Sequence, residues 1–153
     1  MLIARELENL AASQALGERL GRALRPGDFV GLSGGLGSGK TTLVRAIAAG
    51  AGVAADEVSS PTFSLIHRYA GAAFPVHHAD LYRLGSREEL YATGYFDLLD
   101  GQGIVLVEWI DRIALAAPGE WLELRLMSGA NPDARNLEAI GHGSRGEELL
   151  KGL

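Results

Sequence analysis

The chain has 153 residues, which suits one domain with a single core, and its hydrophobic content of 47% is ordinary for a globular protein. It contains no cysteine, which excludes disulfides, thiolate zinc sites and a cysteine nucleophile. A net charge of −5 without long Lys/Arg runs argues against a basic face for nucleic acid. We expect one cytoplasmic domain, residues 1–153, because the sequence has neither a membrane-spanning apolar run nor an export signal.

The N-terminal half predicts a strand, a helix, a second strand, a Gly-rich loop and a second helix. Apolar residues at helical spacing (Leu16, Leu20, Ala23 and Leu24) support the first helix, and a short apolar run before the loop supports the second strand. An irregular loop over 52–61 and a β-hairpin follow. The predicted ranges are 1–7 (strand), 9–25 (helix), 28–32 (strand), 42–49 (helix), and 63–69 with 74–79 (hairpin).

The C-terminal half predicts a short helix, three strands and a final helix. The stretch Ser86-Arg87-Glu88-Glu89 is a capping box that opens the short helix, which ends near Gly94. Strands are predicted over 103–107, 121–127 and 136–142, and a helix over 147–150. Because no ten-residue helices separate the strands after the loop, the sheet is predicted to be mixed. The fold class is therefore α/β, a P-loop NTPase domain with a mixed, partly antiparallel sheet flanked by helices.

The stretch from Gly34 to Thr41 matches G-x-x-x-x-G-K-[ST] without a mismatch and stands between a predicted strand and a predicted helix. In such a loop the backbone N–H groups cradle phosphates, the lysine reaches the β- and γ-phosphates, and the hydroxyl binds Mg²⁺. Lys40 is one of two lysines in a chain whose other basic residues are arginines. The predicted nucleotide-binding residues are Gly35, Leu36, Gly37, Ser38, Gly39, Lys40, Thr41 and Thr42.

A second acidic residue is expected beside the metal at the end of a neighbouring strand. Glu108 follows the apolar run Ile104-Val105-Leu106-Val107 and can reach the metal or its water. The alternative is a charged residue that merely caps a core strand. The chain lacks the Asn-Lys-x-Asp motif that reads guanine, so ATP is the preferred nucleotide and Mg²⁺ the preferred cation.

Two further segments carry polar groups near the predicted phosphates. Strand alternation places His78 and Asp80 on one side of their strand and His77 on the other, and without a third ligand a zinc site there is a poor interpretation. A hydrogen-bonded strand end near the phosphates is the better one. The segment Ser60-Pro61-Thr62-Phe63 stands where switch segments sense a γ-phosphate.

Four stretches occur together in one order and spacing. They are Gly34 to Thr42, Val58-Ser59-Ser60-Pro61-Thr62-Phe63-Ser64-Leu65, His78-Ala79-Asp80-Leu81-Tyr82-Arg83-Leu84, and Val107-Glu108-Trp109. Together they resemble the TsaE (YjeE) family, the ATPase subunit of the bacterial machinery that makes threonylcarbamoyladenosine in tRNA. The resemblance covers nearly the whole chain. The sequence departs from the family pattern at Ile110, often Pro, and at Gly35, often acidic.

The resemblance implies roles for individual positions. Thr41 and Glu108 would bind Mg²⁺, and Asp80 and Thr62 would flank the γ-phosphate as catalytic residues alongside Lys40 and Glu108. Ser13 and Arg135 would line the adenine side, and Trp109 would lie beside the metal or at a partner surface. The implied protein partners are homologues of TsaD and TsaB, which would hold the tRNA, so that this chain meets tRNA only indirectly. Turnover by the isolated subunit is expected to be slow.

Two other functions stay open. A small-molecule or nucleoside kinase of the P-loop class would need an arginine-rich lid and a pocket for a second substrate, and Arg83 and Arg87 give it thin support. A non-enzymatic ATP-binding adaptor would bind the nucleotide without turning it over.

Overall fold

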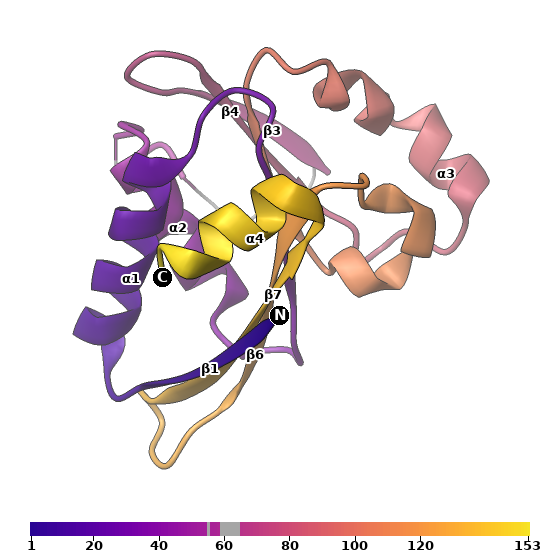
Figure 1. Cartoon of the computed structure of the whole chain (residues 1–153). Coiled ribbons are helices and arrows are strands. Elements are labelled where there is room, and N and C mark those ends of the chain that lie inside the picture. Colours follow the sequence, from indigo (N-terminus) through magenta and orange to yellow (C-terminus); the bar gives the residue numbers. More distant parts are fainter. Residues whose placement is uncertain (55, 59–64) are drawn as a thin grey trace.

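The computed structural model describes residues 1–54, 56–58 and 65–153, and within them seven strands form one sheet (Figure 1). The strand order across the sheet is β1-β7-β6-β2-β5-β4-β3. The strands are β1 (Leu2–Leu7), β2 (Phe29–Ser33), β3 (Ile66–Ala70), β4 (Pro75–Asp80), β5 (Ile104–Glu108), β6 (Trp121–Ser128) and β7 (Arg135–His142).

The helices lie close to their predicted positions, with two differences. The last helix begins at Gly143 rather than near residue 147, and short 3₁₀ turns that the sequence did not predict follow α3 and β5. The α-helices are α1 (Leu10–Ala23), α2 (Lys40–Gly50), α3 (Arg87–Ala92) and α4 (Gly143–Lys151), and the 3₁₀ turns are η1 (Tyr95–Leu99), η2 (Ile110–Arg112) and η3 (Ala114–Ala116).

The sheet is mixed, as predicted. The central strand β2 runs parallel to both β5 and β6, and β4 runs parallel to β5. The pairs β1–β7, β6–β7 and β3–β4 are antiparallel, and the last of these is the predicted hairpin. Because β2, β4 and β5 are parallel, their carboxyl ends meet at the same edge of the sheet, where open α/β sheets bind ligands.

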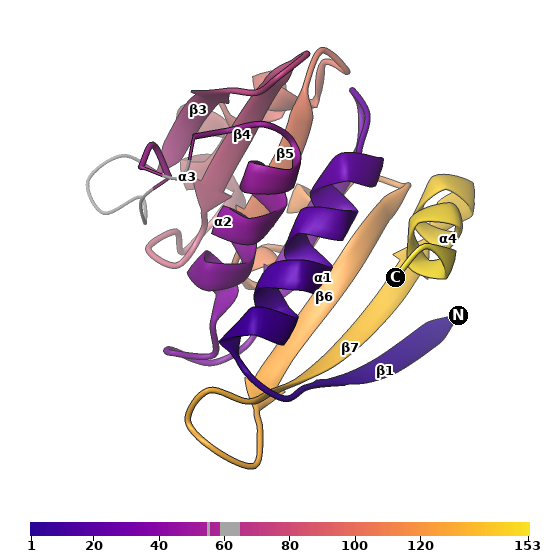
Figure 2. The same cartoon turned by 90° about the vertical axis from the view of Figure 1, so that its left-hand side faces the viewer.

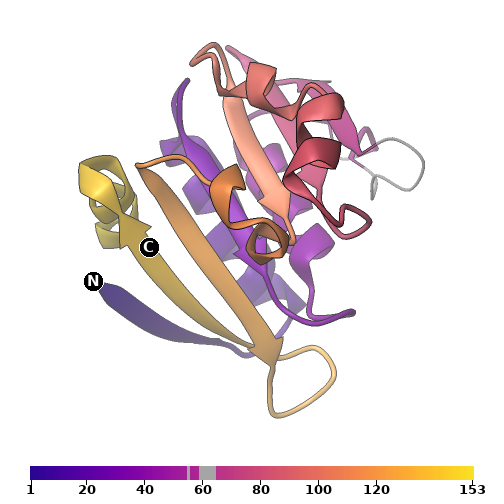
Figure 3. The ribbon, with the colours of Figure 1, turned by 90° about the vertical axis from the view of Figure 1, so that its right-hand side faces the viewer.

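Helices cover the two faces of the sheet unequally. Helices α1 and α2 lie side by side on one face (Figure 2), and Leu149 and Leu150 of α4 belong to the same hydrophobic core. On the other face, α3 and the 3₁₀ turns pack over β4 and β5, whereas β7 and β1 face the viewer uncovered in Figure 3. No helix in the described part of the chain is long and apolar enough to cross a membrane.

Close packing of α1 on α2 depends on glycine. A Cβ atom added to Gly21 would lie 2.0 Å from the carbonyl oxygen of Ile47, and one added to Gly17 would lie 2.4 Å from Cβ of Ala46. The sequence placed Ala23 on the apolar face of α1, but Ala23 is exposed. The two glycines are buried in its place, because the helices approach too closely for larger side chains.

Strand β6 shows how the sheet separates its two faces. Leu122, Leu124 and Leu126 are buried against the helices, and the alternate residues point to the other face.

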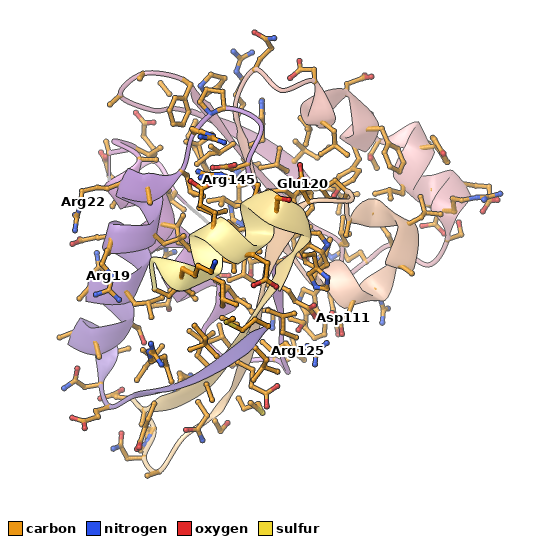
Figure 4. The ribbon with its side chains drawn as sticks, viewed as in Figure 1. Arg19, Arg22, Asp111, Glu120, Arg125 and Arg145 are labelled. Atoms are coloured by element: carbon orange, nitrogen blue, oxygen red, sulfur yellow. The ribbon has the colours of Figure 1, made fainter. Side chains whose placement is uncertain are left out.

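At the start of α4, Arg145 (labelled in Figure 4) donates from Nε and Nη2 to the two carboxylate oxygens of Asp28, at 2.8 and 2.7 Å. This bidentate pair joins α4 to the turn before β2.

Candidate functional site

The Gly-rich loop connects β2 to α2 in the predicted strand–loop–helix order. Gly37 and Gly39 have φ angles of 73° and 99°, in the left-handed region that a residue with a Cβ atom rarely adopts. Helix α2 begins at Lys40, directly after the second of these glycines. The positive end of the helix dipole and the first unpaired N–H groups of the helix are therefore at the loop, an arrangement suited to an anion.

A cavity of about 410 Å³ opens beside the loop at the carboxyl edge of the sheet. It brings together residues from the loop, from the ends of β4 and β5, and from the start of β7. Its lining is Leu36, Gly37, Ser38, Gly39, Lys40, Thr41, Thr42, Leu65, Asp80, Tyr82, Arg83, Glu108, Trp109 and Arg135.

Lys40 is buried in the wall of this cavity, with 5% of its surface exposed. Its Nζ donates to the carbonyl oxygens of Gly34 and Gly35, both at 2.7 Å, and to Oγ of Ser38 at 3.2 Å. Burial lowers the pKa of the Lys40 ammonium, and the nearby carboxylates, Glu108 first among them, oppose this shift only in part.

Glu108 meets the loop from the neighbouring strand. Oγ1 of Thr41 donates to Oε1 of Glu108 at 2.7 Å, although the two residues are 67 positions apart in the sequence. The second carboxylate oxygen, Oε2, accepts a hydrogen bond from Nε2 of His78 at 2.6 Å. His78 is fully buried and Glu108 is 2% exposed. Glu108 is therefore held on both sides rather than being a freely solvated strand end.

Asp80 lies at the end of β4, next to Glu108 in the register of the sheet. Its Oδ1 accepts a hydrogen bond from the backbone N–H of Tyr82 at 2.9 Å. Burial raises the pKa of the Asp80 carboxyl above its ordinary value. The negative charge of Glu108 raises it too, while the hydrogen bond from Tyr82 opposes the shift. Two carboxylates with different environments thus share one edge of the cavity.

Trp109 follows Glu108 in a left-handed conformation, with φ of 58° and ψ of 40°. Its ring packs against that of Tyr82, with a centroid separation of 4.8 Å. Nζ of Lys40 lies 4.1 Å from the centroid of the indole ring. A positive φ is uncommon for a large aromatic residue, and strained backbone of this kind clusters at functional sites. At Trp109 it places the ring over the lysine.

The residues present fit a magnesium ion. A hydroxyl oxygen of Thr41 and a carboxylate oxygen of Glu108 lie within 2.7 Å of each other at the cavity. Magnesium takes oxygen ligands and is commonly held by one or two protein groups together with phosphate oxygens and water. The predicted pair therefore has the donor chemistry for this ion.

The two residues expected on the adenine side also come together. Ser13 and Arg135 line a second, small cavity of about 20 Å³ beside Gly39 and Thr42. Nε of Arg135 donates to the carbonyl oxygen of Ser38 at 2.6 Å, across 97 sequence positions. Arg135 thus contacts the loop directly and lines both cavities.

The other predicted positions stand as follows. In the described chain, Gly35 is outside the lining of the large cavity, although its carbonyl oxygen accepts a hydrogen bond from Lys40. Thr62 and the segment 60–63 lie outside the described residues. His78 and His77 are both buried, and the structure pairs His78 with Glu108.

Sequence reasoning missed the partners of Glu108 and part of the cavity wall. Strand alternation placed His78 on the same side as Asp80, but only the pairing of β4 with β5 brings it to Glu108. Tyr69, whose hydroxyl oxygen lies 3.2 Å from Nδ1 of His78, had no local signal. Tyr82 and Arg83 line the cavity, and the sequence had not placed either of them there.

The chain is similar to known proteins. The family model described as "Threonylcarbamoyl adenosine biosynthesis protein TsaE" matches residues 7–137. A "tRNA threonylcarbamoyladenosine biosynthesis protein TsaE" of Bacillus subtilis is 34% identical over 145 residues, which are 95% of this chain and 89% of the relative. A protein of the same description from Treponema pallidum is 36% identical, over 75% of this chain and 85% of the relative.

A solved structure shares the fold. The crystal structure of YdiB from Bacillus subtilis superposes with a TM-score of 0.77 at 27% identity, covering 99% of this chain and 93% of that one. The family model spans most of the sequence, including the loop, both carboxylates and Arg135. The chain therefore belongs to the TsaE family of threonylcarbamoyl adenosine biosynthesis proteins.

Proposed function

We propose that the chain binds ATP with Mg²⁺ in the large cavity, hydrolyses it, and serves the synthesis of threonylcarbamoyladenosine in tRNA. One observation carries the nucleotide site: Thr41 of the loop and Glu108 of β5 meet at 2.7 Å in the cavity wall, beside Lys40. The names of the relatives support the pathway, since they are described as tRNA threonylcarbamoyladenosine biosynthesis proteins.

Different residues around the cavity would bind the phosphates, the Mg²⁺ ion and the adenine. The loop from Gly37 to Thr42 would bind the phosphates through backbone N–H groups at the start of α2, and Lys40 would place its ammonium on the β- and γ-phosphates. Mg²⁺ held by Thr41 and Glu108 would neutralise charge on the phosphate oxygens. Ser13 and Arg135 lie together beside Gly39 and Thr42 of the loop, and this position supports them as the adenine side.

Asp80 is the candidate for orienting the attacking water and accepting its proton. Its raised pKa makes the carboxylate a better proton acceptor than an ordinary aspartate, and it lines the cavity beside Glu108. Thr62 keeps its proposed role at the γ-phosphate on the basis of the family resemblance alone.

The proposed partners are homologues of TsaD and TsaB in a cytoplasmic complex that holds the tRNA. The net charge of −5 supports indirect contact with tRNA, because a subunit without a strong basic surface gains little from phosphate contacts. Hydrolysis would reset the complex rather than transform a substrate of this chain. By linkage, ATP and the partner complex would then strengthen each other's binding by the same factor.

One set of assays tests this function. ATP turnover is measured with and without the TsaB–TsaD complex, and phosphorylation of candidate small-molecule acceptors is measured in parallel. We expect turnover that the complex stimulates and no transfer to an acceptor. Phosphorylated acceptor would identify a kinase, and binding without turnover in either condition would identify an adaptor. Equal affinity for the complex with ADP, ATP and a non-hydrolysable analogue would show that the nucleotide does not gate assembly.

A further inference from the structure

A chain of hydrogen-bonding side chains runs behind the candidate metal pair, through the core between β3, β4 and β5. Nδ1 of His67 lies 3.3 Å from the hydroxyl oxygen of Tyr69, and that oxygen lies 3.2 Å from Nδ1 of His78. Nε2 of His78 then lies 2.6 Å from Oε2 of Glu108, whose other oxygen accepts from Thr41. His78 and Tyr69 are buried, with 0% and 5% of their surfaces exposed.

The donors and acceptors in this chain determine the tautomer of His78. Both oxygens of an ionised carboxylate only accept hydrogen bonds, so Nε2 of His78 must carry the proton that it shares with Glu108. In the neutral imidazole Nδ1 is then an acceptor, and the hydroxyl of Tyr69 is placed to donate to it. Both ring nitrogens of His78 therefore have a hydrogen-bond partner.

We propose that His78 is a positioning residue for the metal site: its Nε2–H, with the ring oriented by Tyr69, holds the Glu108 carboxylate so that Oε1 faces Thr41. The inference rests on the proposed function, since it names a residue that prepares the same site. A glutamate side chain has several rotatable bonds, and a buried carboxylate oxygen without a hydrogen-bond donor is energetically costly. Without His78, the Glu108 side chain would therefore rotate to another conformation. With His78 in place, the oxygen pair is formed before nucleotide and cation arrive.

The hydrogen bond from His78 to Glu108 is of the kind that orients metal ligands in other proteins. Groups that hydrogen-bond a ligand fix its orientation, and their loss commonly costs about tenfold to hundredfold in metal affinity or activity. His78 is not itself part of the cavity lining and contacts the site through Glu108. Its effect should therefore appear in what Mg²⁺ adds to ATP binding, and not in ATP binding without metal.

Two substitutions separate positioning from mere filling of the core. In His78→Gln the amide nitrogen stands close to the position of Nε2, so a donor to Glu108 is retained. In His78→Asn the side chain is shorter, so its amide nitrogen stands near the position of Nδ1 and cannot reach Glu108. His77→Gln and His77→Asn are matched controls, because His77 is buried on the opposite side of the same strand and has no hydrogen bond at Nδ1 within the described residues.

The measurement is the ratio of ATP affinity in Mg²⁺ to that in EDTA, by calorimetry. We expect this ratio to fall by about tenfold in His78→Asn, to stay near the wild-type value in His78→Gln, and to be unchanged in both His77 variants. If His78→Asn keeps the wild-type ratio, the inference is wrong but the proposed function stands. If the ATP affinity of the wild-type protein is the same in Mg²⁺ and in EDTA, both the proposed function and the inference are wrong.

A second measurement needs no buried substitution. Nitrogen-15 NMR of the histidine rings in the nucleotide-free wild-type protein identifies the protonated ring nitrogen of His78. We expect Nε2 to carry the proton and its N–H resonance to be shifted downfield by the short bond to Glu108. A proton on Nδ1 alone would overturn the inference, because His78 could then not donate to Glu108, whatever the ATP assays show.

Discussion

Nζ of Lys40 lies 4.1 Å from the centroid of the Trp109 ring, so the cation of the Gly-rich loop rests on the face of the residue that follows Glu108. The attraction between a cation and an aromatic face is worth about 0.5–2 kcal/mol, depending on solvation. The same ammonium donates to the carbonyl oxygens of Gly34 and Gly35. Phosphate oxygens would compete for it, which couples nucleotide binding to the surroundings of the indole.

Nucleotide binding is predicted to change the fluorescence of Trp109. The sequence has two tryptophans, Trp109 and Trp121, so Trp121→Phe leaves Trp109 as the sole emitter. We expect ATP with Mg²⁺ to change the emission of Trp121→Phe, because Lys40 moves its charge relative to the indole. In Trp109→Phe the remaining Trp121, which stacks on His142, should give no response. A fluorescence change of equal size in both variants would show that Trp109 does not sense the nucleotide specifically.

Removing the lysine charge is predicted to weaken ATP binding. Hydrogen bonds to charged groups contribute about 1.5–3 kcal/mol each, so Lys40→Ala should lower the affinity for ATP about tenfold to hundredfold or more. The control is Lys151→Ala, which removes the other lysine from an exposed position at the end of α4. Calorimetry that finds unchanged affinity in Lys40→Ala would remove the basis for the phosphate-binding loop.

The Glu108 carboxylate is predicted to serve hydrolysis and the metal rather than ATP itself. Glu108→Gln keeps the shape of the side chain and removes its charge, so ATP should still bind, with wild-type affinity in EDTA, while the gain in affinity from Mg²⁺ shrinks and turnover falls about tenfold or more. Glu123→Gln is a matched control, since Glu123 also accepts a hydrogen bond from a histidine, His142, but outside the cavity. Wild-type turnover in Glu108→Gln would shift the catalytic role to Asp80.

Adding one methyl group between α1 and α2 is predicted to destabilise the fold. In Gly21→Ala the new Cβ would meet the carbonyl oxygen of Ile47 at 2.0 Å. Overpacking costs about 1–3 kcal/mol or more, which exceeds the gain of about 1 kcal/mol that alanine brings to a helix. The expected fall in Tm is about 2–4 °C per kcal/mol for a chain of this size. A Cβ atom added to Gly119 would have no neighbour within 4 Å among the described residues, so Gly119→Ala should be neutral in the same thermal melts.

Acid is predicted to remove a stabilising contribution of Glu123. Burial by itself would raise the pKa of this carboxyl, but hydrogen bonds from His142 and Arg125 outweigh it and hold the pKa below the ordinary value of 4.5. A lowered folded-state pKa stabilises the fold above the unfolded value, and this contribution is lost as pH falls through the folded value. Glu123→Gln should therefore be less stable than wild type at neutral pH, by about 1 kcal/mol or less, because Arg125 is largely exposed.

Denaturant unfolding at several pH values checks this prediction. The difference between wild type and Glu123→Gln should shrink as the pH falls below 4.5. A difference that grows over that range would have the opposite sign and would contradict the assigned hydrogen bonds.

Local features of the sequence were enough to predict the loop and its flanking elements. The glycine spacing, the apolar strand before Gly34 and the helical pattern after Lys40 lie within about twenty residues, so short-range backbone preferences and hydrophobic periodicity decide them. The same is true of the hairpin and of the N-cap of α3, where Oγ of Ser86 accepts from the N–H of Glu89 at 3.2 Å. The mixed sheet followed from the short connections between strands.

The contacts between distant groups depend on the tertiary structure. The contact between Thr41 and Glu108 spans 67 positions, that between His78 and Glu108 spans 30, and that between Arg135 and Ser38 spans 97. The order and register of the sheet create these contacts, and no local pattern in one sequence encodes them. Local sequence patterns were enough to predict a Gly-rich loop between a strand and a helix. The pairing of β5 with β2 and with β4 brings Glu108 to the loop and places His78 behind it, because strand pairing depends on packing between distant segments.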